Sequence, residues 1–152
     1  MELISLIYCS TATKRCDQKA IDDILYMSQR LNSRDGISGI LYFSNSYFMQ
    51  YLEGYPSHIE DTYSRILKDY RHSSLEIIMK EPTQAREFSG WSMAFDPHTE
   101  HLAPLNKKYM NNSEFKPYGI SSSFALEIVR ELKSQLPKAH YADGTEHSDE
   151  NE

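Results

Sequence analysis

The sequence predicts an α+β fold. We expect a ferredoxin-like two-layer sandwich (βαββαββ) with a mixed five-stranded sheet, two helices on one face and a C-terminal helical extension. Segments rich in Leu, Ile, Tyr and Phe alternate with segments whose apolar residues recur every three or four positions, in the order strand, helix, strand, strand, helix, strand, strand. Right-handed crossovers then place both helices on one face of the sheet. A chain of 152 residues has room for one such core and an extension.

The first expected unit is a strand followed by a helix. Residues 2–8 are rich in Leu and Ile, as strands are. From about residue 17 to 33, apolar residues such as Ile21 and Leu25 recur at helical spacing, and Gly36 stops the run. This unit supplies one strand and one covering helix.

A hairpin is expected next. Residues 36–43 and 47–52 are both β-rich, and the three residues between them are enough only for a tight turn. These two strands should therefore pair antiparallel.

The second helix and the last strands follow the hairpin. Ser57 and Glu60 have the capping-box spacing and predict a helix that starts at Ser57 and runs to about residue 71. Residues 75–79 and 91–95 then read as strands. These segments complete the sheet.

The chain divides into three expected parts. Residues 1–97 form the domain, residues 98–137 an extension, and residues 138–152 an acidic tail that we expect to be disordered. In the extension, residues 121–136 have helical apolar spacing and should pack on the sheet face that the other helices leave bare. Such an apolar face also suits self-association, so we expect a homo-oligomer.

Charge and composition narrow the partners. The net charge is −6 and much of it lies in the tail, which leaves the rest of the chain near neutral. Because this part also has no basic stripe, we expect no direct nucleic-acid contact. No apolar run approaches the roughly 18 residues that span a bilayer, so we expect a cytoplasmic protein without membrane contact. Cys9 and Cys16 have neither disulfide-framework nor zinc spacing and are expected to be buried or half-buried thiols.

Polar residues interrupt the apolar pattern at two strands and one helix. Tyr8 and Gln50 fall in apolar strands, where a phenol and a carboxamide need polar partners. On the first helix, Ile24, Ser28 and Asn32 lie at i, i+4 and i+8 on one stripe. Together they predict the polar edge of a ligand site.

The second helix offers charged residues near its expected C-terminal end. Arg65, Asp69 and His72 recur at i, i+4 and i+7, with Arg71 beside them. A slot between the helices would then have amides inside, an apolar wall and cations at its mouth. This arrangement suits a flat heterocycle with a phosphorylated tail.

These residues resemble the BLUF photoreceptors, which sense blue light using flavin. The resemblance runs from about residue 3 to 95 through the pieces Leu6-Ile7-Tyr8, Ser28-Gln29-Arg30-Leu31-Asn32, Gly36-Ile37-Ser38-Gly39-Ile40-Leu41, Phe48-Met49-Gln50-Tyr51-Leu52-Glu53-Gly54, Asp69-Tyr70-Arg71-His72 and Trp91-Ser92-Met93. The family has the ferredoxin-like fold and holds flavin between the two helices. The cofactor implied is FAD, with FMN or riboflavin as alternatives.

The resemblance implies a role for each matched residue. Tyr8 would give an electron and then a proton to excited flavin, and Gln50, between Tyr8 and the flavin N5/O4 edge, would store the signal by rearranging its amide. Trp91 and Met93, on the last strand next to Gln50, would transmit the change. The flavin-binding residues implied are Ile24, Ser28, Asn32, Gln50, Arg65, Asp69, Arg71 and His72.

The expected function is therefore a blue-light photoreceptor without catalytic turnover, which signals to a separate, unidentified partner protein. Two alternatives remain open from the residues. One is a small ferredoxin-like enzyme, an oxygenase or acyl-phosphate hydrolase, with Tyr8, Arg65 or His72 as acid, base or anion clamp. The other is a colourless ligand-sensing or scaffold module in which Gln50 and Asn32 are satisfied core residues.

Overall fold

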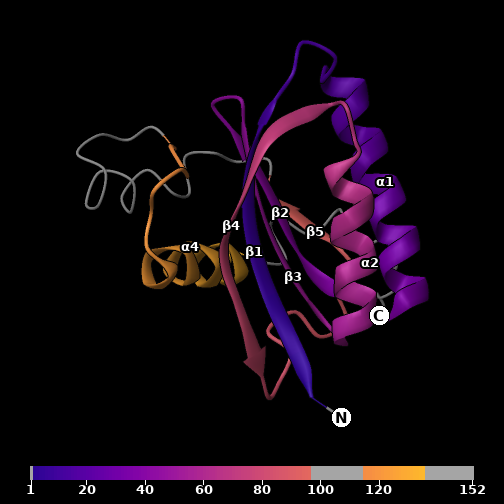
Figure 1. Ribbon diagram of the computed structural model, residues 1–152, viewed down its shortest axis with the longest axis vertical. Coiled ribbons are helices and arrows are strands. Elements are labelled where there is room, and N and C mark those ends of the chain that lie inside the picture. The colour runs from indigo at the N-terminus through magenta and orange to yellow at the C-terminus, as the bar shows by residue number, and fades with distance from the viewer. Residues whose placement is uncertain (1, 97–114, 136–152) are drawn as a thin grey trace.

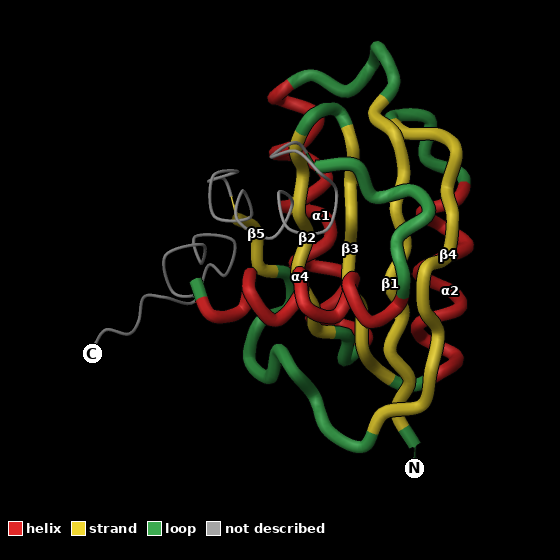
Figure 2. Tube along the Cα trace, turned by 90° about the vertical axis from the view of Figure 1, so that its left-hand side faces the viewer, coloured by secondary structure: helices red, strands yellow, loops and turns green. Residues whose placement is uncertain are grey.

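The predicted fold class is confirmed. The structure, a computed structural model, describes residues 2–96 and 115–135. Helices α1 and α2 lie side by side on one face of a single sheet, and α4 crosses the opposite face (Figures 1 and 2). The elements are β1 (Leu3–Ala12), α1 (Gln18–Asp35), β2 (Ser38–Ser44), β3 (Tyr47–Gly54), α2 (Pro56–Leu67), β4 (His72–Thr83), β5 (Ala94–Asp96) and α4 (Ser122–Ser134).

The sheet has the strand order β4-β1-β3-β2-β5. Its first four strands pair antiparallel, and β5 pairs parallel with β2 through Ala94, Phe95 and Asp96. The last strand thus begins at Ala94 and not at residue 91 as predicted. Before it, the Trp91 carbonyl accepts from the Gly39 amide and the Ser92 carbonyl accepts from the Asn32 side chain. Because the partner of the Ser92 carbonyl is a side chain, regular backbone pairing with β2 begins only at Ala94.

Local sequence explains the first helix and the hairpin. The Asp17 side chain caps α1 by accepting from the Ala20 amide, and Gly36 ends it in the left-handed region at φ 67°. The hairpin turns through Asn45 and Ser46, both at positive φ. Positive φ at both central residues is the turn geometry that matches strand twist.

Helix α2 differs from its prediction at both ends. It starts at Pro56 with Tyr55 at the N-cap position and no side-chain cap, so the predicted capping box at Ser57 is wrong. Proline suits this first position because its fixed φ is already helical. The helix ends at Leu67 and not near residue 71, because His72 already pairs with Ala12 as the first residue of β4.

Helix α4 covers the sheet face that α1 and α2 leave bare, as predicted. Ser121 caps it by accepting from the Phe124 amide. Its inner side chains are buried against the sheet in one core cluster, which includes Ile7, Ile40, Tyr42, Met49, Tyr51, Met79, Phe124, Ala125, Ile128, Val129 and Leu132. A second cluster fills the space under α1 and α2. The central strands β1, β2 and β3 are therefore buried on both faces, whereas most side chains of the edge strand β4 are exposed or half-buried.

Glycine is required at one position in β2. A Cβ on Gly39 would lie 1.9 Å from the Tyr51 carbonyl oxygen, which is backbone and cannot move aside. A Cβ on Gly36 would meet nothing within 4 Å and would only be strained by its φ of +67°. We expect Gly39→Ala to lower the free energy of unfolding by about 3 kcal/mol or more and Gly36→Ala by about 1 kcal/mol. Urea unfolding followed by circular dichroism measures both, and equal losses would contradict the packing argument.

Some expectations fall wholly or partly outside the described residues. The acidic tail at 138–152 lies outside them, as do 98–114 and the last two residues of the expected extension. Cys9 is buried and Cys16 half-buried, both as free thiols, which confirms that prediction. Across 2–96 and 115–135, no helix is both long and apolar enough to cross a bilayer.

Candidate functional site

A cavity of about 200 Å³ opens between α1 and α2 above the sheet. Every residue predicted to bind the cofactor lies in its lining, together with Tyr8. The lining consists of Tyr8, Ile24, Met27, Ser28, Leu31, Asn32, Leu41, Phe48, Gln50, Thr62, Arg65, Ile66, Asp69, Arg71 and His72. The fold thus gathers residues from α1, α2, four strands and the turn after α2 around one space.

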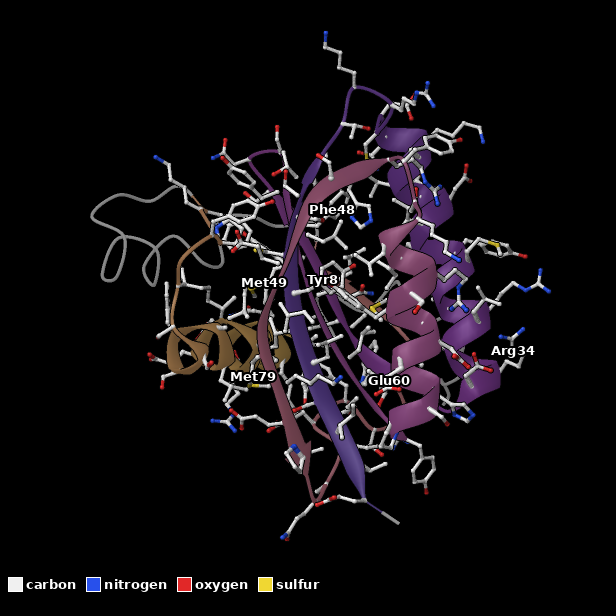
Figure 3. All side chains as sticks on the ribbon, in the orientation of Figure 1. Tyr8, Arg34, Phe48, Met49, Glu60 and Met79 are labelled. Atoms are coloured by element: carbon white, nitrogen blue, oxygen red, sulfur yellow. The ribbon has the colours of Figure 1, made fainter. Side chains whose placement is uncertain are left out.

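Tyr8 and Gln50 form the inner polar pair of the cavity. They face each other in the register of β1 and β3, and the Tyr8 hydroxyl donates to Gln50 Oε1 at 2.5 Å. Both side chains are buried, and Figure 3 shows Tyr8 between the sheet and α2. On its other side Gln50 Nε2 donates to Met93 Sδ at 3.4 Å, a weak acceptor. The amide orientation is therefore set mainly by Tyr8.

Burial keeps Tyr8 in its neutral form. Desolvation raises the pKa of the Tyr8 phenol well above its ordinary value, and the nearby Tyr63 and Asp69 raise it further. The Tyr63 ring packs edge-on at 5.5 Å. A neutral phenol has a hydroxyl proton to donate, so the Tyr8–Gln50 hydrogen bond persists across the physiological pH range.

Helix α1 supplies a second polar edge. Asn32 is 2% exposed, and its Nδ2 donates to the Ser92 carbonyl at 3.1 Å. Ser28 and Ile24 lie successive turns earlier on the same stripe and line the same cavity. The predicted stripe therefore faces the cavity and not solvent.

Charged residues gather after the end of α2. Arg71 holds the Asp69 carboxylate through its Nε at 2.9 Å, a terminal nitrogen at 2.6 Å and its backbone amide at 3.0 Å. Although burial pushes the pKa of Asp69 upward, these hydrogen bonds outweigh it and the pKa is lowered. Arg65, still on the helix, donates to Thr62 Oγ1 at 3.5 Å. The helical spacing predicted for this group is wrong beyond residue 67, but the turn brings the residues together.

His72 already uses both ring nitrogens within the protein. Nε2 lies 2.8 Å from the Ile66 carbonyl and Nδ1 lies 2.8 Å from Ser10 Oγ. A carbonyl oxygen only accepts, so Nε2 carries a proton and donates. The ring also packs edge-on against Tyr8 at 6.4 Å. This geometry supports a wall position for His72 better than a bond to a phosphate tail.

Trp91 and Met93 lie on opposite faces of the sheet. Met93 is fully buried in the helix-side cluster and contacts Gln50, whereas Trp91 packs against the α4-side cluster. Both precede β5, so the prediction that they lie on the last strand is wrong. Because Trp91 and Met93 point to opposite faces, the segment before β5 still contacts the core on both sides of the sheet.

Several lining residues were not assigned from the sequence. They are mostly apolar and comprise Met27, Leu31, Leu41, Phe48, Thr62 and Ile66. Strand alternation could have identified Phe48, which lies two positions before Gln50 on the same face, and pairing could have identified Leu41, opposite Gln50 in β2. The site is thus a slot with apolar walls and an amide edge.

Comparison with known proteins decides the family. The family model described as sensors of blue light using FAD (BLUF) matches residues 3–94. This chain belongs to the BLUF family. BLUF domains bind flavin and act in light-regulated signalling, so this chain contains a flavin-binding blue-light photoreceptor domain. The match does not favour the enzyme or the colourless module.

Relatives of this BLUF chain include larger proteins. The photoactivated adenylate cyclase subunit alpha of Euglena gracilis is 26% identical over 103 residues, which cover 66% of this chain and 10% of that protein. The blue light- and temperature-regulated antirepressor BluF of Escherichia coli (strain K12) is 31% identical over 86 residues, 57% of this chain and 21% of BluF. The chain thus matches only a small part of these curated relatives.

Two of the matching solved structures are covered over most of their length. The dark-state structure of BlrB, a BLUF protein, has a TM-score of 0.76 and 29% identity, covering 89% of this chain and 98% of BlrB. The ground state of BlsA has a TM-score of 0.77 and 25% identity, covering 86% of this chain and 87% of BlsA.

Proposed function

We propose that Tyr8 and Gln50 are the light-responsive pair of this BLUF chain and that it signals to a separate protein without catalytic turnover of its own. One observation carries the proposal. The buried Tyr8 hydroxyl donates to Gln50 Oε1 at the inner wall of the cavity, while Gln50 Nε2 donates to a thioether, which is a weak acceptor. A carboxamide in that position has donor capacity left for a cofactor edge.

The residues around the cavity fit a flavin. Ile24, Leu31 and Phe48 give flat apolar walls, and Ser28 and Asn32 give a polar edge on α1. Bound flavin supplies blue-light absorption and accepts an electron. We further propose FAD as the cofactor, with Arg65 and the Asp69–Arg71 pair near its tail and His72 in the wall.

In the proposed light reaction, one proton is transferred and the hydrogen bonding of the Gln50 amide changes. Tyr8 would give an electron to the excited flavin, and its hydroxyl proton would pass along the hydrogen bond to Gln50 Oε1 while Gln50 Nε2 releases a proton toward the flavin edge, so the amide stays neutral. Return of the electron and one proton would restore the Tyr8 phenol. Rotation or tautomerisation of the Gln50 amide then exchanges a donor for an acceptor at the flavin edge. Met93, which accepts from Gln50 Nε2, is the first residue to lose or change a contact.

The proposed output runs from the sheet to α4 and on to a partner. Light shifts a two-state equilibrium, and a partner that binds the two states with different affinity reads the shift. Met93 and Trp91 span the two faces of the sheet and are suited to transmit it. Self-association, the domain boundary near residue 97 and the cytoplasmic location stay predictions.

The test is an absorption spectrum of the purified protein before and after blue light, with the released chromophore identified by chromatography. A flavin spectrum that moves slightly to the red without bleaching and returns in the dark is expected. A colourless protein that does not take up FAD, FMN or riboflavin would contradict the proposal and direct attention to the enzyme alternative.

The raised pKa of Tyr8 gives a pH prediction. Its folded pKa lies above the ordinary value of 10.0, so the phenol stays protonated up to that pH, and any stability linked to it is lost only as pH rises further. Gln50 does not titrate. We expect the size of the red shift to be constant from about pH 8 to about pH 10. A loss of the shift with a midpoint inside that range would contradict a protonated, buried Tyr8.

A further inference from the structure

We propose that Glu53 is a positioning residue that anchors the segment 86–93, here called the strap, and so couples the flavin pocket to α4. This inference rests on the proposed function. Figure 2 shows the chain leaving the end of β4, crossing the end of the sheet and reaching β5 at the opposite edge. The strap is the part of this crossing that ends at Met93, the residue in contact with Gln50.

Glu53 is a carboxylate with no exposed surface, held by four donors. The Glu87 amide donates to its Oε1 at 2.7 Å and the Phe88 amide to its Oε2 at 2.8 Å. Tyr51 and Ser38 donate from the sheet at 2.9 and 2.7 Å. Two strands and the strap therefore meet at one buried group.

An arginine completes this anchor. Arg86 donates to Ser38 Oγ at 2.9 Å and to the Glu53 carbonyl at 3.3 Å, which brings a positive charge beside the buried carboxylate. A buried charge is costly unless it is paired and hydrogen-bonded. A residue that only filled the core would not need four hydrogen-bond donors and a nearby arginine. Because two of the donors are backbone amides of the strap, we infer that Glu53 fixes the position of the strap.

The far end of the strap is tied to the pocket. The Trp91 carbonyl accepts from the Gly39 amide at 3.1 Å, and the Ser92 carbonyl accepts from Asn32 at 3.1 Å. Met93 accepts from Gln50. Two residues of the flavin pocket thus hold the strap a few positions after the Glu53 anchor.

The near end of the strap is tied to α4. The Glu87 side chain pairs with Arg130 at 3.3 Å and with Lys133 at 3.4 Å. Phe88 is buried in the cluster beneath α4, with its ring 5.5 Å from Tyr51. Glu53 holds the amides of both Glu87 and Phe88, the two strap residues that contact α4 or the cluster beneath it. A movement at Met93 is therefore passed along the strap to α4.

The test uses Glu53→Gln in the full chain. The substitution keeps the shape but replaces one acceptor oxygen with an NH2 group, which faces a backbone amide that also donates. Trp91 is the single Trp of the chain, so acrylamide quenching of its fluorescence reports the strap in the dark and under blue light. We expect a normal flavin red shift, with the light-dependent change in Trp91 quenching reduced about tenfold.

The matched control is Glu60→Gln, an exposed carboxylate on α2 that pairs with Lys80 at 3.7 Å. It should keep both the red shift and the Trp91 response. If Glu53→Gln fails to fold, Ser38→Ala, which removes one donor and leaves the carboxylate, should give a smaller loss of the same response.

Two results would overturn the inference. A variant of lower stability that keeps the full Trp91 response would show that Glu53 is only structural. Loss of the red shift together with the Trp91 response would place Glu53 in the pocket machinery and would also overturn the inference. By contrast, a wild-type protein without a red shift would refute the proposed function itself.

Discussion

Replacing Tyr8 with Phe is expected to abolish the reversible red shift while flavin stays bound. The phenyl ring keeps the packing against Tyr63 and His72, so the cavity keeps its shape. The hydroxyl that donates to Gln50 Oε1 is lost, and with it the proton whose movement rearranges the amide. Absorption spectra before and after blue light measure the shift, and the ratio of flavin to protein absorbance measures binding.

Tyr63→Phe is the matched control for this change. Its ring neighbours that of Tyr8 at 5.5 Å, but Tyr63 comes from α2 and does not line the cavity between α1 and α2. This variant should keep a red shift of normal size. A normal shift in Tyr8→Phe would refute the role given to the phenol.

Replacing Gln50 with Leu is expected to have an equally large effect. Leu fills a similar volume but can neither accept from Tyr8 nor donate to a cofactor edge. It also leaves the buried Tyr8 hydroxyl without its acceptor, which should cost about 1–3 kcal/mol in the free energy of unfolding. We expect flavin to remain bound, no red shift and a lower midpoint in urea.

A second glutamine provides the control for this substitution. Gln84 is exposed in the loop after β4, and Gln84→Leu should leave both the spectrum and the urea midpoint unchanged. If Gln50→Leu shifted to the red and recovered as the wild type does, the amide could not be the switch.

The inner half of the site could be predicted because it follows strand and helix periodicity. Tyr8 and Gln50 interrupt apolar strands whose alternation fixes the face on which they lie, and Ser28 and Asn32 recur on one helical stripe. A polar residue at a buried position is a conspicuous local signal. Local spacing therefore sufficed to bring these four residues to one cavity.

The outer half could not be predicted in the same way, because its geometry depends on tertiary pairing. Helical spacing predicts Asp69, Arg71 and His72 near the C-terminal end of the second helix, but the pairing of His72 with Ala12 ends α2 earlier. The start of β5 likewise depends on the contact between Asn32 and Ser92, sixty positions apart. Periodicity within one segment carries no information about such partners.

The Glu53 anchor shows the same limit. A glutamate after the apolar run of β3 reads as the end of a strand, yet it is buried because the amides of Glu87 and Phe88 reach it from 34 and 35 positions away. The sequence around a single glutamate does not indicate which distant backbone amides will donate to it in the folded chain. Only the folded chain reveals that this residue joins the sheet to the strap.

The central claim, that the Gln50 amide changes its hydrogen bonding when light is absorbed, is tested most directly by infrared difference spectroscopy. Light-minus-dark spectra would be compared between the unlabelled protein and protein made with isotope-labelled glutamine. We predict difference bands in the amide carbonyl region that move with the label and are absent in Gln50→Leu, alongside a downshifted flavin carbonyl band. A normal red shift without any glutamine-sensitive band would contradict the account.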